Sequence, residues 1–338
     1  MKARRVLAVD AGNSKTVAVV ADDDGTVLGR ATAGPGDIYG TEAEELAVAA
    51  VESAIDDALR EAGVRADTVA AATCCLAGVD WPEDADLWRS HLARRLPRAK
   101  LDVRNDGYAL LWCLNPAGTG AAITVGTGPA IAARASDGRT AVMGFWCQHP
   151  LGAVGLGEEA LRAVHLAELG MAPATALREA FLAAFGCGDV EELLHQLTRR
   201  GTSGGWSRLA HAAGIVTVCA NDGDLVARTL VDEQARLLVA YAQAVALRAG
   251  VDLVQGGPDG RRWPVALGGG VVSSDQRYRE ALVNEIAGRL PGARAVHISA
   301  DPVVGSLIGA LGLLGEGLAE AGFASLLPTS GPSAEVSS

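Results

Sequence analysis

The sequence predicts an α/β protein of two similar lobes. Its 338 residues exceed the roughly 250–300 at which single hydrophobic cores stop growing, so two lobes are expected. The same order of elements occurs twice, with three strands first and alternating helices and strands after them. In each half a glycine-containing turn follows the first strand, at Gly12 and at Gly126–Gly128.

Three strands open the first half. Val6–Asp10 is a continuous apolar run that ends in an acid, and Thr16–Ala21 is apolar and β-branched. Val27–Ala31 follows the turn Asp22-Asp23-Asp24-Gly25, which is a strong hairpin signal.

Helices and strands alternate after this hairpin. Thr41 and Glu44 form a capping-box pattern before an amphipathic helix that extends to about Gly63. The remaining elements of this half are a strand over Thr68–Cys74, a helix from Pro82 to about Leu96, a strand over Leu101–Arg104 that ends at Asn105-Asp106, and then an apolar helix.

The second half repeats the three-strand start, with strands over Ala121–Val125, Ala130–Arg134 and Thr140–Met143. A long helical stretch from about Gly157 to Gly250 is expected to break near Gly201–Gly205 and Asn221–Gly223. The last elements are a strand over Val265–Leu267, a helix over Asp275–Leu290, a strand over Ala295–Ile298 and a helix over Pro302–Glu316.

We therefore expect an N-terminal lobe over residues 1–115 and a C-terminal lobe over residues 116–328 that carries a helical insertion at about 157–250. The Ser- and Pro-containing residues 329–338 are expected to form a disordered tail.

Composition excludes several classes of function. The net charge of −11 and only 4% aromatic residues argue against a nucleic-acid partner. The uncharged run Gly107–Ala133 contains Asn115-Pro116 and several glycines, so it is typical of buried elements joined by a turn and not of a membrane span.

The cysteines also indicate a compartment. The six cysteines contain no CxxC pair, which is typical of free thiols in a reducing compartment, so we expect a cytoplasmic protein. Cys147 and His149 could supply half of a metal site, but nothing nearby in the sequence completes four ligands.

The turn from Asp10 to Thr16 is the first candidate for chemistry. Glycine allows close approach of the backbone to an anion, and successive amides in such a turn bind phosphate. Asp10 could orient magnesium through water, and Lys15 could reach a phosphate as a point charge. The alternative is an ordinary hairpin with an exposed lysine, since no Walker motif is present.

Gly126-Thr127-Gly128 occupies the equivalent place in the second half, and Asp106 ends a strand between the two turns. A carboxylate there is a candidate general base for a hydroxyl nucleophile. The alternative reading is that Asn105 or Asp106 caps a helix. Gly268-Gly269-Gly270 could let adenosine lie against the backbone, or could be a plain glycine turn.

These motifs, in this order, resemble the BadF/BadG/BcrA/BcrD ATPase family and in particular its N-acetylglucosamine kinase branch. The motifs are Asp10-x-Gly12-x-x-Lys15-Thr16, Leu76-Ala77-Gly78-Val79-Asp80, Asn105-Asp106, Gly126-Thr127-Gly128, Gly268-Gly269-Gly270 and Pro302-Val-Val-Gly305, over residues 5–315.

The resemblance implies two ribonuclease-H-like lobes of the actin/hexokinase/Hsp70 superfamily that close over ATP and Mg²⁺. It implies that Asp106 deprotonates a sugar hydroxyl and that Asp10 lies beside the metal. The nucleotide would be held by Asp10, Gly12, Asn13, Ser14, Lys15, Thr16, Gly126, Thr127, Gly128, Gly268, Gly269 and Gly270. The acceptor would be held by Asp37, Gly78, Asn105 and Asp106.

This sequence departs from the family pattern on the acceptor side. Asp37 stands where the family usually has asparagine, and Pro129 follows the GTG turn in place of serine or asparagine. Leu151–Gly157 lacks the acidic pair of the family's sugar-binding segment. Since a site built to hydrogen-bond particular hydroxyls discriminates strongly, we expect a sugar or amino-sugar kinase whose acceptor differs from N-acetylglucosamine.

Two other functions remain open at this stage. Relatives of this fold include ATPases that activate partner enzymes through an iron–sulfur cluster at a dimer interface, and Cys147 or Cys187 could hold one, although no paired spacing supports it. A degenerate protein that binds sugar or nucleotide without turnover is the second alternative. A homodimer is also left open.

Overall fold

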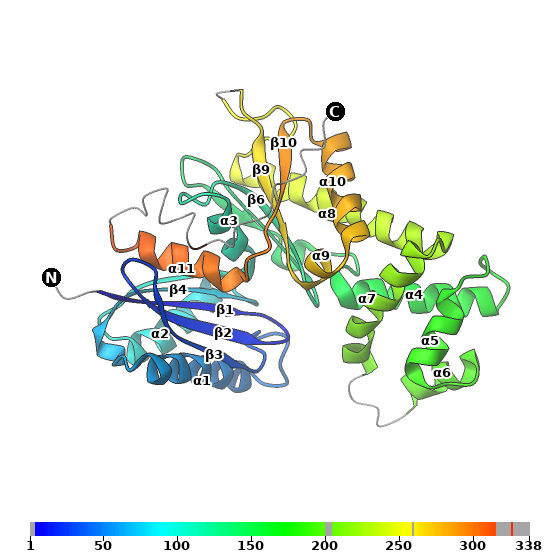
Figure 1. The fold of residues 1–338 in the computed structure, drawn as a ribbon, viewed down its shortest axis with the longest axis horizontal. Helices are drawn as coiled ribbons and strands as arrows, with labels where there is room; N and C mark the ends of the chain where they lie inside the picture. The colour runs from blue at the N-terminus through cyan, green and yellow to red at the C-terminus, as the bar shows by residue number, and fades with distance from the viewer. Residues whose placement is uncertain (1–3, 200–204, 259, 316–325, 327–338) are drawn as a thin grey trace.

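The chain contains two five-stranded sheets, each joined to its own set of helices (Figure 1). The computed structural model describes residues 4–199, 205–258, 260–315 and 326. The predicted break near Gly201–Gly205 and the predicted tail over residues 329–338 fall largely or wholly outside these residues.

The first sheet has the strand order β3-β2-β1-β4-β5. Its strands are β1 (Arg5–Ala11), β2 (Thr16–Asp22), β3 (Val27–Ala33), β4 (Val69–Leu76) and β5 (Lys100–Asn105). The first three strands are antiparallel, whereas β4 pairs parallel to β1 and β5 parallel to β4. All five strands were predicted, to within a few residues at each end.

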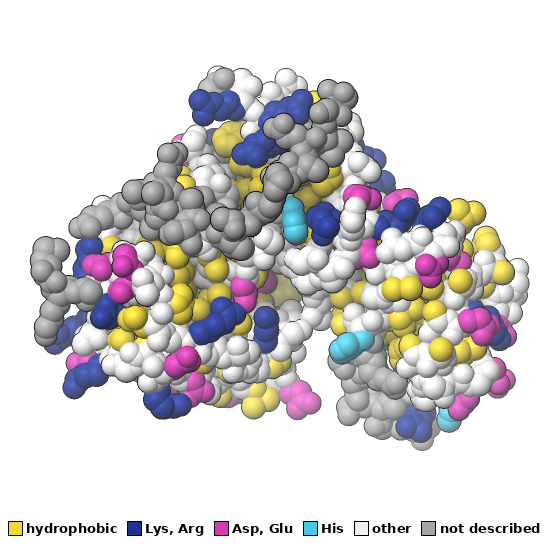
Figure 2. All heavy atoms as spheres, in the orientation of Figure 1, with side chains coloured by type: hydrophobic (Ala, Val, Ile, Leu, Met, Phe, Trp, Pro, Cys, Tyr) yellow, Lys and Arg dark blue, Asp and Glu magenta, His cyan; other side chains and the backbone are white. Residues whose placement is uncertain are grey.

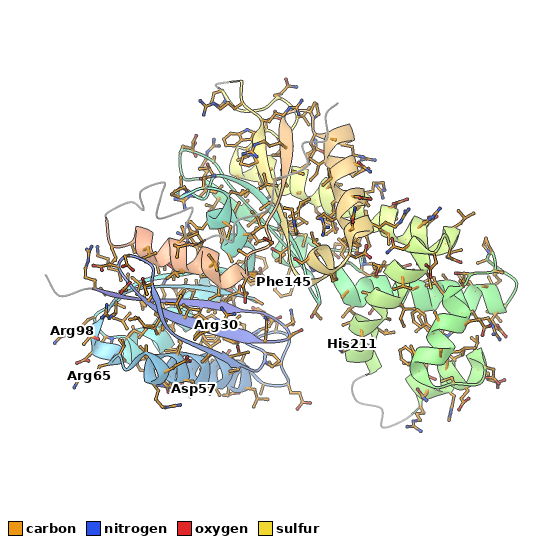
Figure 3. The ribbon with its side chains drawn as sticks, in the orientation of Figure 1. Arg30, Asp57, Arg65, Arg98, Phe145 and His211 are labelled. Carbon is orange, nitrogen blue, oxygen red and sulfur yellow. The ribbon has the colours of Figure 1, made fainter. Side chains whose placement is uncertain are left out.

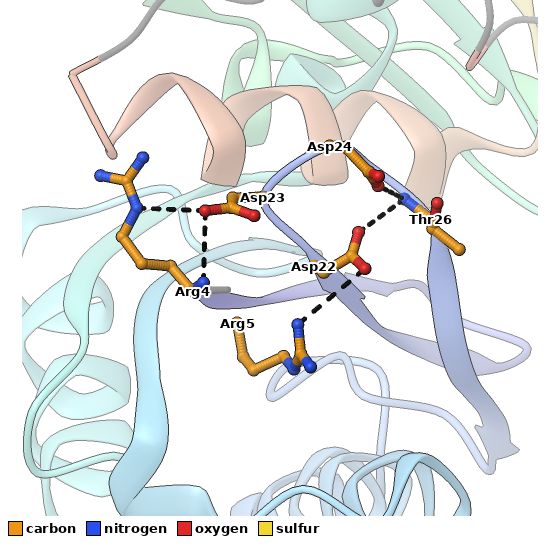
Figure 4. A network of polar contacts seen from close by, with 6 residues as sticks. All are labelled: Arg4, Arg5, Asp22, Asp23, Asp24 and Thr26. Atoms are coloured by element: carbon orange, nitrogen blue, oxygen red, sulfur yellow. Dashed lines mark hydrogen bonds and ion pairs between the residues drawn. The ribbon is translucent and has the colours of Figure 1, made fainter. Parts of the chain in front are cut away.

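The turn between β2 and β3 is held by a polar network (Figure 4). The Thr26 amide donates to the carboxylates of Asp22 and Asp24, at 3.1 and 2.8 Å, and Gly25 takes a φ of 91°. The Arg4 amide donates to Asp23 at 3.2 Å, which ties the turn to the start of β1. The predicted hairpin is confirmed.

Helices cover both faces of the first sheet. They are α1 (Glu44–Ala62), α2 (Pro82–Arg95) and, from the end of the chain, α11 (Pro302–Gly312), with the one-turn helix η1 (Ala66–Thr68) before β4. Alternate residues of β1 point to opposite faces. Leu7 and Val9 join the core under α1, and Val6 and Ala8 join the core under α11.

The predicted capping box at the start of α1 is wrong. The N-cap residue is Ala43, which provides no side-chain hydrogen bond, and Glu44 is already the first helical residue. The Thr41 hydroxyl instead donates to the carbonyls of Asp37 and Ala43, at 3.1 and 2.9 Å. Thr41 therefore stabilises the loop that carries Asp37. Its hydroxyl is used in this loop and not as a cap of α1, because turns and helix caps compete for the same side chain.

The second sheet repeats the topology of the first. Its order is β10-β9-β6-β7-β8, with β6–β7 and β7–β8 antiparallel and β6–β9 and β9–β10 parallel. Its strands are β6 (Gly120–Val125), β7 (Pro129–Arg134), β8 (Thr140–Val142), β9 (Trp263–Gly268) and β10 (Ala293–His297). The predicted duplication is confirmed, and β1 and β6 occupy equivalent central positions.

Short helices connect these strands. They are η2 (Asp106–Tyr108), α3 (Ala109–Leu114), η3 (Gly144–Trp146), α9 (Gly270–Ser274) and α10 (Gln276–Arg289). The sequence did not predict α9, because five residues are too few to establish helical periodicity.

The helical insertion contains more breaks than predicted. It consists of α4 (Gly152–Glu168), α5 (Leu177–Phe185), α6 (Val190–Thr198), α7 (Gly205–Asn221) and α8 (Leu225–Ala249). The break at Asn221–Gly223 is confirmed, and further breaks follow α4 and α5. The first helix begins at Gly152, five residues before the predicted start, so most of the segment Leu151–Gly157 is helical.

Candidate functional site

A cavity of about 520 Å³ lies between the lobes, at the carboxyl ends of the central strands. Its volume is within the roughly 300–1,000 Å³ typical of small-molecule sites. Figure 2 shows the surface hollowed between the first lobe and the helical insertion. The lining comes from both lobes, and includes the β1–β2 turn, the β6–β7 turn, α7, α9 and the start of α11.

The β1–β2 turn supplies one wall of this cavity. Asp10, Gly12, Asn13, Ser14 and Lys15 all line it, as predicted from the sequence. The turn is closed by the Gly12 amide, which donates to the Lys15 carbonyl at 2.9 Å, and it leaves the three residues after Gly12 exposed. Lys15 is the one lysine or arginine in the described lining of this cavity.

Thr16 does not line the cavity, although the sequence predicted a nucleotide contact for it. It is completely buried at the start of β2, where it pairs with Ala11 and Ala33. Successive side chains of a strand point to opposite faces of the sheet. The Lys15 side chain is exposed, so the side chain of the next residue, Thr16, points into the core.

The β6–β7 turn faces the first turn across the cavity. Gly126, Thr127 and Gly128 all line it, and the Thr127 Oγ1 and Ser14 Oγ atoms form a hydrogen bond of 2.7 Å between the lobes. The start of α4 supports the turn from behind, because the amides of Ala153 and Val154 donate to the carbonyls of Gly126 and Thr127 at 2.9 and 3.1 Å.

The segment Leu151–Gly157 therefore serves the β6–β7 turn. Of its residues, only Ala153 lines the 520 Å³ cavity, and none lines the second cavity described below. Ala153 is thus the one residue of this segment in the described lining, and it brings no carboxylate to the larger cavity.

Of the three glycines at 268–270, only Gly270 lines the cavity, together with Val271 and Ser274 of α9. Gly268 and Gly269 lie behind it. A Cβ atom at Gly269 would come within 2.6 Å of the Val125 carbonyl oxygen, and one at Gly268 within 2.7 Å of Leu110. These two glycines allow close packing of β9 against β6 and α3, and neither is part of the described lining of the cavity.

A second, smaller cavity of about 160 Å³ adjoins the first. The two cavities share Asn13, Asp106, Pro129 and Ala130. The second cavity is further lined by Asp37, Gly78, Asp80, Asn105 and Phe145, so all four residues predicted on the acceptor side lie here. Asp106 alone supplies a carboxylate to both spaces.

Two glycines allow the loops of this cavity to approach each other. Gly78 has a φ of 76°, and a Cβ atom on it would come within 2.6 Å of Asp37 Oδ1. Gly144 has a φ of 45°, and a Cβ atom on it would come within 2.6 Å of Asp80 Oδ1. Each glycine thus permits a carboxylate to lie directly against the backbone of another loop.

Asn105 and Asp106 have separate structural roles. Asn105 Oδ1 accepts from the Gly107 amide at 2.9 Å and caps η2, while Asn105 Nδ2 donates to Asp80 Oδ1 at 2.9 Å. The capping reading of the sequence therefore applies to Asn105. The Asp106 carboxylate is left at the junction of the two cavities.

Comparison with known proteins identifies the family. Residues 7–313 match the sequence profile of the BadF/BadG/BcrA/BcrD ATPase family, which is nearly the whole chain. The chain belongs to this family.

Solved structures with the same fold include two described as candidate N-acetylglucosamine kinases. The protein from Chromobacterium violaceum has a TM-score of 0.67 and 24% identity, with 90% of this chain and 98% of that chain covered. The protein from Porphyromonas gingivalis has a TM-score of 0.63 and 20% identity, with 91% and 98% covered.

A ROK family glucokinase from Streptomyces griseus, solved with glucose and AMPPNP, has a TM-score of 0.55 and 19% identity over 91% of this chain and 98% of that chain. At these identities the likeness shows the two-lobed actin-like fold. No curated protein matches the chain.

Carboxylates dominate the electrostatics of the site in this BadF/BadG/BcrA/BcrD family member. The pKa of Asp10 is raised from 3.8 to about 8, first by burial and then by the charges of Asp106 and Asp301, against a lowering by Lys15. The pKa of Asp106 is raised to about 7, first by burial and then by the charges of Asp80 and Asp37, against a lowering by backbone hydrogen bonds. The cavity therefore favours a cation or a proton.

Magnesium with a nucleotide fits this donor set. The described residues contain no group of three histidine, cysteine or acidic side chains that could hold a metal ion by themselves. Mg²⁺ in phosphoryl-transfer sites usually takes one or two carboxylates and completes its coordination with phosphate oxygens and water. Asp10, at the end of β1 and beside the two phosphate-type turns, supplies such a carboxylate.

The sequence analysis missed several lining residues. Asp80 belongs to a motif that was recognised, yet only Gly78 of that motif was assigned to the site. Phe145 and the α7 residues Ala210, His211, Ala213 and Gly214 carried no sequence signal, since none of them belongs to a motif that the sequence analysis recognised. His211 lies at the edge of the gap between α7 and the first lobe (Figure 3).

The cysteines form no metal site in the described part of the chain. Cys74, Cys75, Cys113 and Cys219 are buried, and Cys147 and Cys187 are half-buried. The Cys147 thiol donates to the His149 carbonyl at 3.4 Å, and the His149 ring hydrogen-bonds Tyr241 at 2.8 Å. Among the described helices, none combines the length and apolar character that crossing a membrane requires.

Proposed function

We propose that this protein is an ATP- and Mg²⁺-dependent kinase that transfers the γ-phosphate to a hydroxyl of a small sugar-like acceptor. The observation that carries the proposal is the position of Asp106, whose carboxylate lines both a cavity of nucleotide size and a smaller adjoining cavity. A general base must contact the acceptor hydroxyl from one side, and the phosphoryl donor must lie on the other side of that hydroxyl.

Each wall of the larger cavity has a role in this proposal. The backbone amides of the Gly12–Lys15 and Gly126–Gly128 turns bind phosphate oxygens from opposite lobes, and Lys15 adds a positive charge. Asp10 would hold the magnesium ion. The small residues Ala210, Ala213 and Gly214 of α7, opposite Gly270 and Val271, leave room for the adenosine.

The chemical step depends on residues of the first lobe. Asp106 accepts the proton of the acceptor hydroxyl as the oxygen attacks the γ-phosphorus and the bond to the ADP oxygen breaks. The bound magnesium nucleotide supplies the phosphoryl group and neutralises the charge on its oxygens. Asn105 fixes the peptide after Asp106, because its Oδ1 atom accepts the Gly107 amide at the start of η2, and so positions the base.

The test is phosphoryl transfer itself. The purified protein is incubated with Mg²⁺, γ-³²P-labelled ATP and a panel of sugars, amino sugars and cyclitols, and labelled products are separated from ATP and phosphate. We expect label in at least one acceptor, and transfer slower by roughly 10²–10⁴-fold with the Asp106→Asn variant. Label that appears only as free phosphate, at a rate no acceptor changes, would favour the activator-ATPase alternative.

A further inference from the structure

The side chains that line the 160 Å³ cavity are rich in hydrogen-bond acceptors and poor in donors. Asp37, Asp80 and Asp106 contribute carboxylates, and no lysine, arginine or histidine occurs among the described residues of the lining. Asn105 already directs an N–H to Asp80 and its oxygen to Gly107, so Asn13 is the other side-chain amide at the wall. A ligand that completes this lining must itself bring hydrogen-bond donors, and a positively charged donor matches the carboxylates best.

Asp37 is the strongest evidence for a positively charged ligand. It is only 8% exposed, and its Oδ1 atom accepts the Tyr39 amide at 3.0 Å within its own loop. No lysine or arginine forms an ion pair with Asp37 or Asp80 among the described residues. A carboxylate held this deep beside a cavity, without a cation, is costly unless the ligand supplies one.

Aromatic rings stand at the same cavity. Phe145 lines it from the second lobe and contacts two rings of the first lobe: Tyr39 edge-on at 5.0 Å between centroids, and Trp81 stacked at 6.3 Å with 12° between the planes. These three rings are about half exposed, at 52% for Tyr39, 46% for Trp81 and 49% for Phe145. The face of an aromatic ring attracts cations and covers the apolar face of a small ring.

We propose that the acceptor is a positively charged amino sugar or aminocyclitol, whose ammonium group is held by Asp37 and Asp80 beside the hydroxyl that Asp106 deprotonates. An ammonium group offers three donors and one positive charge, which match the carboxylates of the lining. An N-acetyl group in the same place offers one N–H and a carbonyl oxygen that finds few donors. This inference rests on the proposed kinase function.

The experiment compares ligands that differ only in this group. Glucosamine, N-acetylglucosamine and glucose share one ring and differ at one carbon, and scyllo-inosamine and scyllo-inositol, which also differ at one carbon, provide a second charged and neutral pair. Binding is measured by calorimetry with Mg²⁺ and a non-hydrolysable ATP analogue, and kcat/KM is measured with ATP. We expect at least one ammonium-bearing compound to exceed its neutral partners by tenfold or more in both measurements.

Variants of Asp37 and Asp80 test whether these two carboxylates hold the ammonium group. Asp37→Asn and Asp80→Asn should each reduce the preference for the charged ligand at least tenfold, since each removes one facing charge. Asparagine at position 37 keeps an oxygen for the Tyr39 amide, and thermal unfolding checks the fold. Asp57→Asn is the matched control, because Asp57 lies on α1, pairs with Arg60 at 2.7 Å and lines neither cavity (Figure 3). It should leave the preference unchanged.

The outcomes separate this inference from the kinase proposal. Equal or better binding and turnover of the neutral compounds overturns the charged acceptor and leaves the kinase. Tighter binding of the charged compounds, lost in Asp37→Asn and Asp80→Asn but without phosphoryl transfer to any compound, supports the ammonium site and overturns the kinase. If both variants keep the full preference for the charged ligand, Asp37 and Asp80 do not hold the ammonium group.

Discussion

Ser14 Oγ and Thr127 Oγ1 lie 2.7 Å apart, although 113 residues separate them in the chain. Each residue is at the tip of the turn that follows the first strand of its half. The hydrogen bond therefore joins the equivalent turns of a duplicated fold across the larger cavity. Because the bond is exposed, it contributes little to stability, and its significance is that it joins two turns that line the same cavity.

Gly152 controls the position of the second turn. It has a φ of 79°, and a Cβ atom on it would come within 2.7 Å of the Gly128 backbone. We expect Gly152→Ala to raise the Kd for the nucleotide tenfold or more, because the Gly126–Gly128 turn must shift. Calorimetry with a non-hydrolysable ATP analogue measures this.

The control for this variant is Gly170→Ala. Gly170 has a φ of 68° but no atom within 4 Å of an added Cβ. It should lose about 1–2 kcal/mol of stability from the left-handed backbone alone and keep its nucleotide affinity. Equal affinities in the two variants would contradict the role given to Gly152.

Asp106→Asn should lower kcat by roughly 10²–10⁴-fold and leave nucleotide binding nearly unchanged. Asparagine preserves the size of the side chain but cannot accept a proton from the acceptor hydroxyl. Steady-state kinetics and calorimetry on the same preparation separate the two effects. A variant with normal turnover would remove Asp106 from the mechanism.

The rate should depend on pH through Asp106. Its pKa is raised to about 7, and the base acts only when ionised, so kcat/KM should fall about tenfold per unit as the pH drops below 7. Asp80 is one of the charges that raise this pKa, so Asp80→Asn should move the acid limb to lower pH. The profile is measured with both substrates below saturation. A limb that stays in place, or moves to higher pH, contradicts the coupling of these carboxylates.

Asp10→Asn should stabilise the free protein while impairing catalysis. The pKa of Asp10 is about 8 in the fold and near 3.8 when exposed, so ionising the folded protein costs free energy that accumulates as the pH rises from about 4 to 8. Asparagine avoids this cost, and we expect about 1–3 kcal/mol of added stability at pH 8.5 that shrinks toward pH 5.

Chemical denaturation without magnesium or nucleotide measures this difference. Asp57→Asn controls for the loss of one charge and should show no such gain. The stabilisation of wild-type protein by Mg²⁺ with nucleotide should be reduced in Asp10→Asn, because the carboxylate that holds the cation is missing. If Asp10→Asn were less stable than the wild-type protein at pH 8.5, the ionised Asp10 carboxylate would not be destabilising the fold.

Local patterns were enough to predict the order of the strands, the duplication and the presence of the two glycine turns. Strand periodicity and glycine turns depend on neighbouring residues, so Val6–Asp10, the Asp22–Gly25 turn and Ala121–Val125 could be recognised without knowledge of the fold. The capping-box prediction at Thr41 was wrong because a threonine hydroxyl can hydrogen-bond within a turn or cap a helix, and the local sequence does not distinguish the two.

Only the tertiary structure decided which residues share a cavity. The folded chain brings Ser14 to Thr127, Asp80 to Asn105 and Phe145 to Tyr39, and it buries Thr16 and Gly268 away from the cavity. These relations depend on how two sheets pack and on the direction of each side chain, which is a property of long-range contacts. The sequence specified the parts of the site, and the packing of the lobes specified their arrangement.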